Sequence, residues 1–302
     1  SFNVISLDTS MLNSLSEINK IDTVYHYCRT DSFLSIIKNK KLWLSSMDHL
    51  NDFMEKRLFI SEFEKFINES EDPKVYQSIR RSIEANMNLG TPYLCCLSGS
   101  GDILSQWRSY GQDGYGLSIG FDPDKLVAHK GTKIMNNGLM EYSIFLNKVE
   151  YLDTKSIYDL IATLMHEYRG VVKFHNGNLD FDNQPPDFQN KIVDLDRQFF
   201  HFNTHIKSDA FKEENEIRLV YVHNKDHDSG ANNRPINNLT YRISNNNLTS
   251  YFEFVIPHDA INKIYLGPKN KFSENDVRSF LKHSGIGNYQ DVEILKSIAT
   301  YC

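Results

Sequence analysis

The chain has 302 residues and a net charge of −6, so it lacks the broad basic surface of proteins that bind duplex nucleic acid. Its composition, 40% hydrophobic and 12% aromatic, excludes a disordered chain and supplies a sizeable core. No apolar run approaches the roughly 18 to 20 residues of a membrane span and the opening residues lack a secretion signal, so we expect a cytoplasmic protein without a membrane partner.

Apolar residues at period two predict strands in the first half of the chain, and apolar residues at helical spacing predict helices. We expect strands at 23–28, 41–46, 93–98 and 115–121. A short helix follows the first strand with Asp31 as its N-cap. Longer helices are expected at 54–67, where the apolar residues form one stripe, and at 73–88.

The second half continues with helices at 156–173, 187–211 and 273–283 and strands at 216–223, 250–256, 263–266 and 291–295. Between them, the Asn-rich stretch 224–247 is predicted to be a long surface loop. Because helices are inserted between local groups of strands without a regular βαβ order, we predict an α+β fold with a mixed, mainly antiparallel sheet. The whole chain, 1–302, is expected to form one catalytic domain with its core from about residue 23 onward.

The segment 211–221, FKEENEIRLVY, carries the strongest local signal. If it forms a strand, period two places Glu214, Glu216 and Arg218 on one face and apolar residues on the other. Three crowded charges must either face water or build a polar site, since their burial without partners is costly. Both an exposed salt-bridged strand and a functional site fit the pattern.

Three weaker signals lie elsewhere. His26 sits in the apolar strand VYHYC, where it is either a core residue or a catalyst. The segment SQWRSYGQDGYG places Trp107, Arg108 and Tyr110 beside a glycine-rich turn, which suits stacking on a planar ligand ring and pairing with a phosphate, although Trp107 also fits a core position. Asp52, with its neighbours, fits a helix cap.

Several familiar chemistries are not indicated. The sequence has no phosphate-binding P-loop, no complete dinucleotide glycine fingerprint and no nucleophile elbow. His201 and His205 share a helix face, but Phe202 stands where a zinc protease requires glutamate. The cysteines fit neither a disulfide framework nor zinc spacing, so we expect reduced core thiols and no bound metal; they are Cys28, Cys95, Cys96 and Cys302.

A series of motifs, taken in order, resembles a known bacterial family, the domain of unknown function 2971. The segments are VYHYC, SFLSIIKNKKLWLSSMDHLND, CLSGSGDILSQWRSYGQDGYGLSIGFD, ENEIRLV and INKIYLGP. The resemblance runs from about residue 23 to the C-terminus. Phe53 departs from the proline that the family usually has after Asn-Asp, which affects only the local turn.

The order of the motifs also resembles the layout of ADP-ribosyltransferases, with a histidine on the first strand and Glu-x-Glu on a late strand. That resemblance implies NAD as substrate, Glu216 as the catalytic glutamate and Glu214 as the group that orients the acceptor. His26 would hold the ribose, and a ring of Trp107 or Tyr110 would stack on nicotinamide. The residues implied to contact NAD are His26, Tyr27, Ser45, Ser46, Trp107, Arg108, Tyr110 and Arg218, with either Arg108 or Arg218 at the pyrophosphate.

We therefore expect an ADP-ribosyltransferase that modifies a macromolecule, with RNA, DNA or a translation component as the preferred acceptor. The resemblance implies a toxin or phage-defence effector, with an antitoxin or other inhibitory protein as partner. His26, a ring from 107–110 and Glu216 should then line one cleft of about 300 to 1,000 Å³. The alternatives are a nuclease that binds Mg²⁺ through Asp52, Glu214 and Glu216, and a ligand-sensing module without catalysis.

Overall fold

One sheet organises the computed structural model, which describes residues 19–47, 53–87, 91–126, 144–175, 178–179, 186, 188–223, 236–244 and 246–301. The strand order is β11-β12-β2-β3-β1-β4-β13-β14, and β3 also pairs with β10, which pairs with β5. All these pairs are antiparallel except β13 with β14, so the structure confirms a mixed, mainly antiparallel α+β fold. The strands are β1 Val24–Cys28, β2 Lys41–Ser46, β3 Thr91–Ser98, β4 Leu117–Phe121, β5 Ile144–Lys148, β10 Glu216–His223, β11 Thr240–Ser244, β12 Asn247–Val255, β13 Ile261–Leu266 and β14 Glu293–Lys296.

The sheet opens along one edge of β3. The other edge of β3 pairs with β10 over the full length of both strands. On the open side, β1 pairs only through Tyr25 with Ser98, whereas β2 pairs through Ser45 with Leu94 and Ser46 with Tyr93. The described strands β1 and β2 therefore diverge from the middle of β3, and the sheet forks there.

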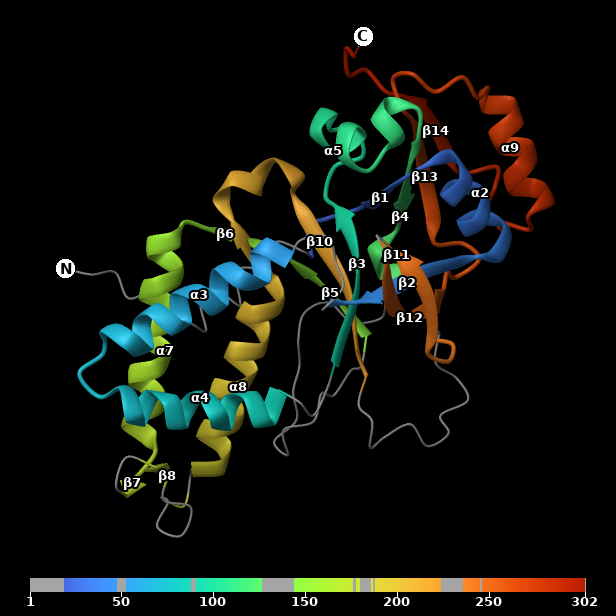
Figure 1. Cartoon of the computed structure of the whole chain (residues 1–302). Helices are drawn as coiled ribbons and strands as arrows, with labels where there is room; N and C mark the ends of the chain where they lie inside the picture. Colours follow the sequence, from blue (N-terminus) through green and yellow to red (C-terminus); the bar gives the residue numbers. More distant parts are fainter. Residues whose placement is uncertain are drawn as a thin grey trace.

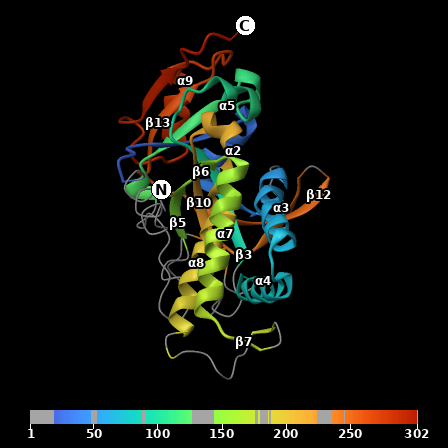
Figure 2. The same ribbon diagram turned by 90° about the vertical axis from the view of Figure 1, so that its left-hand side faces the viewer.

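Helices cover both faces of the sheet (Figures 1 and 2). On one side, four helices form an apolar cluster of their own: α3 Phe53–Glu69, α4 Pro73–Met87, α7 Thr154–Val171 and α8 Phe188–His205. The other face carries the main core, to which α2 Thr30–Asn39 contributes Phe33 and Ile37 and α9 Glu274–His283 contributes Val277 and Leu281. No helix in the described ranges is long and apolar enough to cross a membrane.

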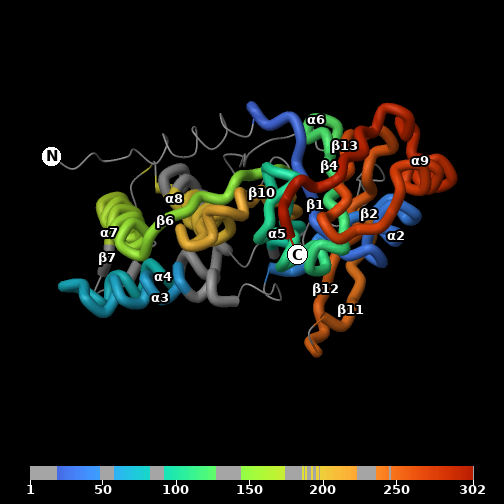
Figure 3. Tube along the Cα trace, turned by 90° about the horizontal axis from the view of Figure 1, so that it is seen from above, coloured from blue at the N-terminus to red at the C-terminus, as the bar shows by residue number. Residues whose placement is uncertain are grey.

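Shorter elements connect these layers. They are α5 Leu104–Ser109, α6 Pro123–Leu126, β6 Glu150–Leu152, β7 Phe174–His175, β8 Asn178–Leu179, β9 Ile206–Ser208, and the 3₁₀ turns η2 Gln112–Gly114 and η3 Asp209–Glu214. Seen from above, the hairpin of β11 and β12 projects from the rest of the molecule (Figure 3).

Three predicted elements were wrong in detail. The helix expected at 187–211 ends at His205, because β9 then pairs with β6 and the Ser208 side chain caps η3. The loop expected at 224–247 contains β11, while 224–235 and 245 lie outside the described residues. Asp31 is not the cap of α2: Arg29 holds the N-cap position and Asp31 lies in the first turn, where its charge favours the helix dipole.

Candidate functional site

A pocket of about 430 Å³ lies where the sheet forks. Its walls come from the sheet strands β1, β2, β3, β10, β11 and β12, from the helices α2, α3, α5 and α8, and from the segment between α8 and β10. The volume falls within the range of small-molecule sites. The side chains of His26, Tyr110 and Glu216 all line it, as the sequence predicted.

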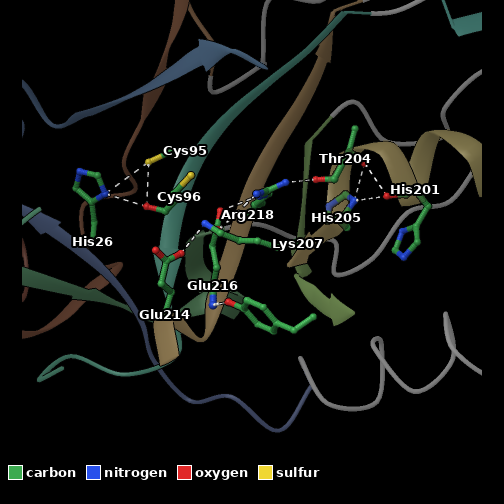
Figure 4. A network of polar contacts seen from close by, with 11 residues as sticks. His26, Cys95, Cys96, His201, Thr204, His205, Lys207, Glu214, Glu216 and Arg218 are labelled. Carbon is green, nitrogen blue, oxygen red and sulfur yellow. Dashed lines mark hydrogen bonds and ion pairs between the residues drawn. The ribbon is translucent and has the colours of Figure 1, made fainter. Parts of the chain in front are cut away.

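Four charged side chains form one wall of the pocket, and we call them the acidic end: Glu214, Glu216, Lys207 and Arg218 (Figure 4). Glu216 accepts a hydrogen bond of 2.8 Å from Arg218 Nε through Oε1 and lies 3.2 Å from Lys207 Nζ through Oε2. Lys207 Nζ also lies 2.6 Å from Glu214 Oε2. Two carboxylates are thus neutralised by two cations inside the protein.

Local structure fixes Glu216 in this position. It begins β10 opposite Ser98 of β3, and its backbone N–H donates to the hydroxyl of Tyr151 at 2.7 Å. Ile217 on the next position is fully buried in the main core, so Glu216 and Arg218 take the opposite face. Although burial tends to raise the pKa of Glu216, Arg218 and Lys207 hold that pKa below its ordinary value, and the carboxylate is ionised.

Glu214 is the more open carboxylate of the pair. Its side chain is 17% exposed against 5% for Glu216. The sequence interpretation placed Glu214 in the strand. In the structure η3 ends at Glu214 and Asn215 adopts a left-handed conformation with φ of 46°, so Glu214 precedes the strand. Its backbone carbonyl accepts a hydrogen bond from Ser98 at 2.8 Å, which ties this turn to β3.

A buried polar layer lies behind Arg218 (Figure 4). Its Nη1 donates to the backbone carbonyl of Thr204 on α8. His205 stacks on His201 with ring centroids 4.9 Å apart. Burial, with contributions from His201 and Arg218, lowers the pKa of His205 well below its ordinary value, so this ring is neutral.

His26 reaches the pocket because the sheet is open. Strand alternation places it on the same side of β1 as the core residues Val24 and Cys28, whereas Glu216 lies opposite the core residue Ile217 on β10. An unbroken sheet would separate the two side chains. At the fork, the His26 Nδ1 atom instead lies 3.2 Å from the carbonyl oxygen of Cys96, and burial lowers its pKa.

The segment 107–110 divides between core and pocket. Tyr110 lines the pocket and is 44% exposed, which leaves ring surface for a ligand. Trp107 is fully buried, and its Nε1 donates to Asp102 at 2.7 Å, so its interpretation as a stacking ring was wrong. Arg108 does not line the pocket either, because its guanidinium lies over the Tyr301 ring at 4.9 Å from the ring centre. It is therefore not placed to bind a pyrophosphate in this pocket.

The remaining predicted contacts lie near the fork. Tyr27 lines the pocket, but its hydroxyl donates to the Ser100 carbonyl at 2.9 Å and accepts from the Ile103 N–H at 2.8 Å. Ser45 lines the pocket, whereas Ser46 is buried in the sheet and is not among the lining residues. The Tyr27 hydroxyl and the Ser46 side chain therefore contribute to the packing of the fold.

Sequence reasoning missed three cationic residues of the pocket, Lys41, Lys207 and Arg242. Lys207 was assigned to a helix that ends before it. Arg242 was assigned to the Asn-rich loop, although the alternation in TYRIS, residues 240–244, is a strand signal that could have been used.

The acidic end is unsuited to the predicted alternative of a Mg²⁺ site. The Lys207 ammonium lies between the two carboxylates that would hold the cation. Asp52, the third proposed ligand, lies outside the described residues. Within the part of the chain that the structure describes, no three His, Cys, Asp or Glu side chains are grouped to hold a metal ion.

Comparison with known proteins gives one family match. Residues 106–219 match the family described as Protein of unknown function (DUF2971). The match supports the family resemblance. It spans α5 to the middle of β10 and so contains Tyr110, Lys207, Glu214, Glu216 and Arg218. The search of curated proteins and the search of solved structures each gave no match.

Proposed function

We propose that the protein is an NAD-dependent ADP-ribosyltransferase with a fold of that type, and that it transfers ADP-ribose to a macromolecule. One observation carries the proposal: the ionised, buried carboxylate of Glu216 lies on the wall of a pocket that is also lined by His26 and Tyr110. A fixed negative charge, a partly exposed aromatic ring and a histidine of lowered pKa in one pocket fit the groups that the resemblance assigns to NAD cleavage.

The chemistry assigns Glu216 its role. When the bond between the ribose and the nicotinamide nitrogen breaks, the electron pair leaves with nicotinamide and positive charge develops on the ribose. A carboxylate held in advance near that charge stabilises the transition state without reorganising. Lys207 and Arg218 keep Glu216 ionised and oriented before the substrate arrives. An acceptor nucleophile then bonds to the ribose carbon and loses its proton.

The other pocket residues take complementary roles in this proposal. Tyr110 stacks on the nicotinamide ring and His26 contacts the ribose. Glu214, which is more exposed than Glu216, is assigned to the acceptor and orients it. Arg218 positions Glu216, to which its Nε donates, and therefore takes no part at the pyrophosphate in this proposal.

The acceptor is proposed from the resemblance to toxins and defence effectors. RNA, DNA or a translation component is preferred, and a toxin of this kind is expected to have an antitoxin or other inhibitory partner. The net charge of −6 favours an acceptor held by local contacts over one held by a broad basic surface.

The proposal is tested by incubating the protein with NAD and with total RNA, DNA and ribosomes. We expect nicotinamide release, unchanged by a chelator, and a mass increase of one ADP-ribosyl group on one of these acceptors. If the protein neither binds nor cleaves NAD with any acceptor present, the transferase proposal fails. Loss of activity in the chelator with recovery on adding Mg²⁺ supports the nuclease instead.

A further inference from the structure

Arg242 places a guanidinium in the pocket from the edge strand β11. Its Nη2 donates to Ser45 Oγ on β2 at 3.0 Å, so the side chain reaches across β12. The guanidinium carbon lies 4.9 Å from the centre of the Trp43 ring and 5.8 Å from that of Tyr251. Two aromatic rings and a hydroxyl thus hold the cation in one orientation.

The charge of Arg242 is not compensated by the residues that the structure describes. Its Nε is buried and has no hydrogen-bond acceptor among them, and no described carboxylate forms an ion pair with it. Glu253, which also lines the pocket, is paired with Lys41 at 2.6 Å. Burial lowers the pKa of Arg242, the direction expected for a cation that has lost water without gaining an anion.

The strand register places Arg242 on the same face of the sheet as the acidic end. Ser45, to which it donates, pairs with Leu94 of β3, and Leu94 pairs with Val220 of β10. Glu216 lies four residues before Val220 on that strand. The guanidinium and Glu216 are therefore separated by two strand spacings, roughly 10 Å, and by roughly 13 Å along the strand. A ligand that contacts both must be elongated.

We propose that Arg242, with Ser45 and the rings of Trp43 and Tyr251, forms the subsite for the pyrophosphate of a bound dinucleotide. A guanidinium with free N–H groups binds phosphate oxygens in bidentate fashion, and phosphate supplies the charge that the site lacks. Trp43, which is 42% exposed, offers its ring to the adjoining base. The identity of the ligand as NAD rests on the proposed function; the preference for a phosphorylated ligand does not.

The test is calorimetric titration of the purified protein with ADP-ribose, ADP, inorganic pyrophosphate and adenosine. Wild type is expected to bind ADP-ribose and ADP more tightly than adenosine, which has no phosphate. Arg242→Gln should weaken ADP-ribose and ADP by about tenfold to a hundredfold, because a charged hydrogen bond is lost, and should leave adenosine unchanged. Arg242→Lys, which keeps the charge but not the fork, should give an intermediate loss.

Arg108→Gln is the matched control, since it removes an arginine that lies outside the pocket. It should bind all four ligands as wild type does, with thermal melts showing that every variant is folded. Equal affinity of wild type and Arg242→Gln for ADP, or no affinity of wild type for either phosphorylated nucleotide, overturns the subsite. If Arg242-dependent binding is found but NAD is not cleaved, the transferase proposal fails and the subsite stands. If NAD is cleaved but Arg242→Gln binds ADP-ribose and ADP as wild type does, the subsite fails and the transferase proposal stands.

Discussion

The two ends of the pocket differ in whether their charged side chains have counter-charges among the described residues. At the acidic end, Lys207 and Arg218 are paired with Glu214 and Glu216 before any ligand arrives. At the other end, Arg242 has rings and a hydroxyl around it but no described carboxylate partner. On the proposed function, the first cluster stabilises a reacting ligand, and on the proposed subsite, the phosphate of that ligand supplies the anion for Arg242.

The largest expected effect is on the folding stability that the acidic end contributes. Arg218→Leu removes the cation that binds Glu216 and the Thr204 carbonyl, and leaves a buried carboxylate with Lys207 alone. Breaking a buried pair from one side costs about 3 to 5 kcal/mol, to be measured by urea denaturation. Arg108→Leu, at an exposed site, should change the free energy of unfolding by less than about 0.5 kcal/mol. Similar small losses in both variants would show that the cluster does not hold the fold.

A nearly equal effect is expected on catalysis. Glu216→Gln keeps the shape of the side chain but removes the charge that stabilises the ribosyl cation, so nicotinamide release should fall about 10²- to 10³-fold, or roughly 3 to 4 kcal/mol of barrier. Some stability should also be lost, because Arg218 and Lys207 lose a counter-charge. Assays therefore belong below the melting temperature of the variant. Glu274→Gln on the surface of α9 is the control, and wild-type turnover in Glu216→Gln contradicts the assigned role.

Glu214→Gln should separate hydrolysis from transfer, with a smaller effect. Since Glu214 is assigned to the acceptor, the rate of NAD hydrolysis should stay within about threefold of wild type while acceptor labelling falls about tenfold or more. Both rates are measured in one reaction, from nicotinamide release and from labelled acceptor. An equal loss of both would mean that the two carboxylates act on the same step.

The buried polar layer behind Arg218 gives the smallest expected effect, a dependence of folding stability on pH. The pKa of His205 is lowered by burial and by the neighbouring His201 and Arg218. The unfolded chain therefore binds more protons, and stability present above the ordinary pKa of 6.5 is lost as the pH falls below it. His205→Phe should flatten the melting temperature between about pH 6.5 and 5, whereas replacing the exposed His258 should not. Parallel curves for wild type and His205→Phe would be evidence against a buried neutral ring.

The sequence predicted the parts of the site that depend on local pattern. Period two in β10 separates Glu216 and Arg218 from Ile217, and burial of Ile217 then fixes which face the charges take. Strand boundaries such as those of β2 followed from the same alternation. Trp107 could not be assigned in this way, because a tryptophan beside a glycine turn suits a core and a ligand equally well; its bond to Asp102 decides.

The partners of the charges could not be predicted, because tertiary contacts select them. Lys207 follows an amphipathic helix whose pattern continues past its end, and only the pairing of β9 with β6 stops it. Arg242 lies in β11, where Tyr241 and Ile243 alternate with polar residues and signal a strand. Only the pairing of β11 with β12, and of β12 with β2, shows that Arg242 reaches the pocket. His26 and Glu216 share a pocket because two strands, β1 and β2, pair with the same edge of β3 and leave a fork between them.

The most direct test is a crystal structure with a non-hydrolysable NAD analogue. If the acidic end is the reaction centre and Arg242 the anion site, one ligand should bridge them. Its nicotinamide ribose should then contact Glu216 and its pyrophosphate Arg242. A ligand bound outside the pocket, or one whose pyrophosphate lies away from Arg242 with its ribose away from Glu216, would contradict this division of the pocket.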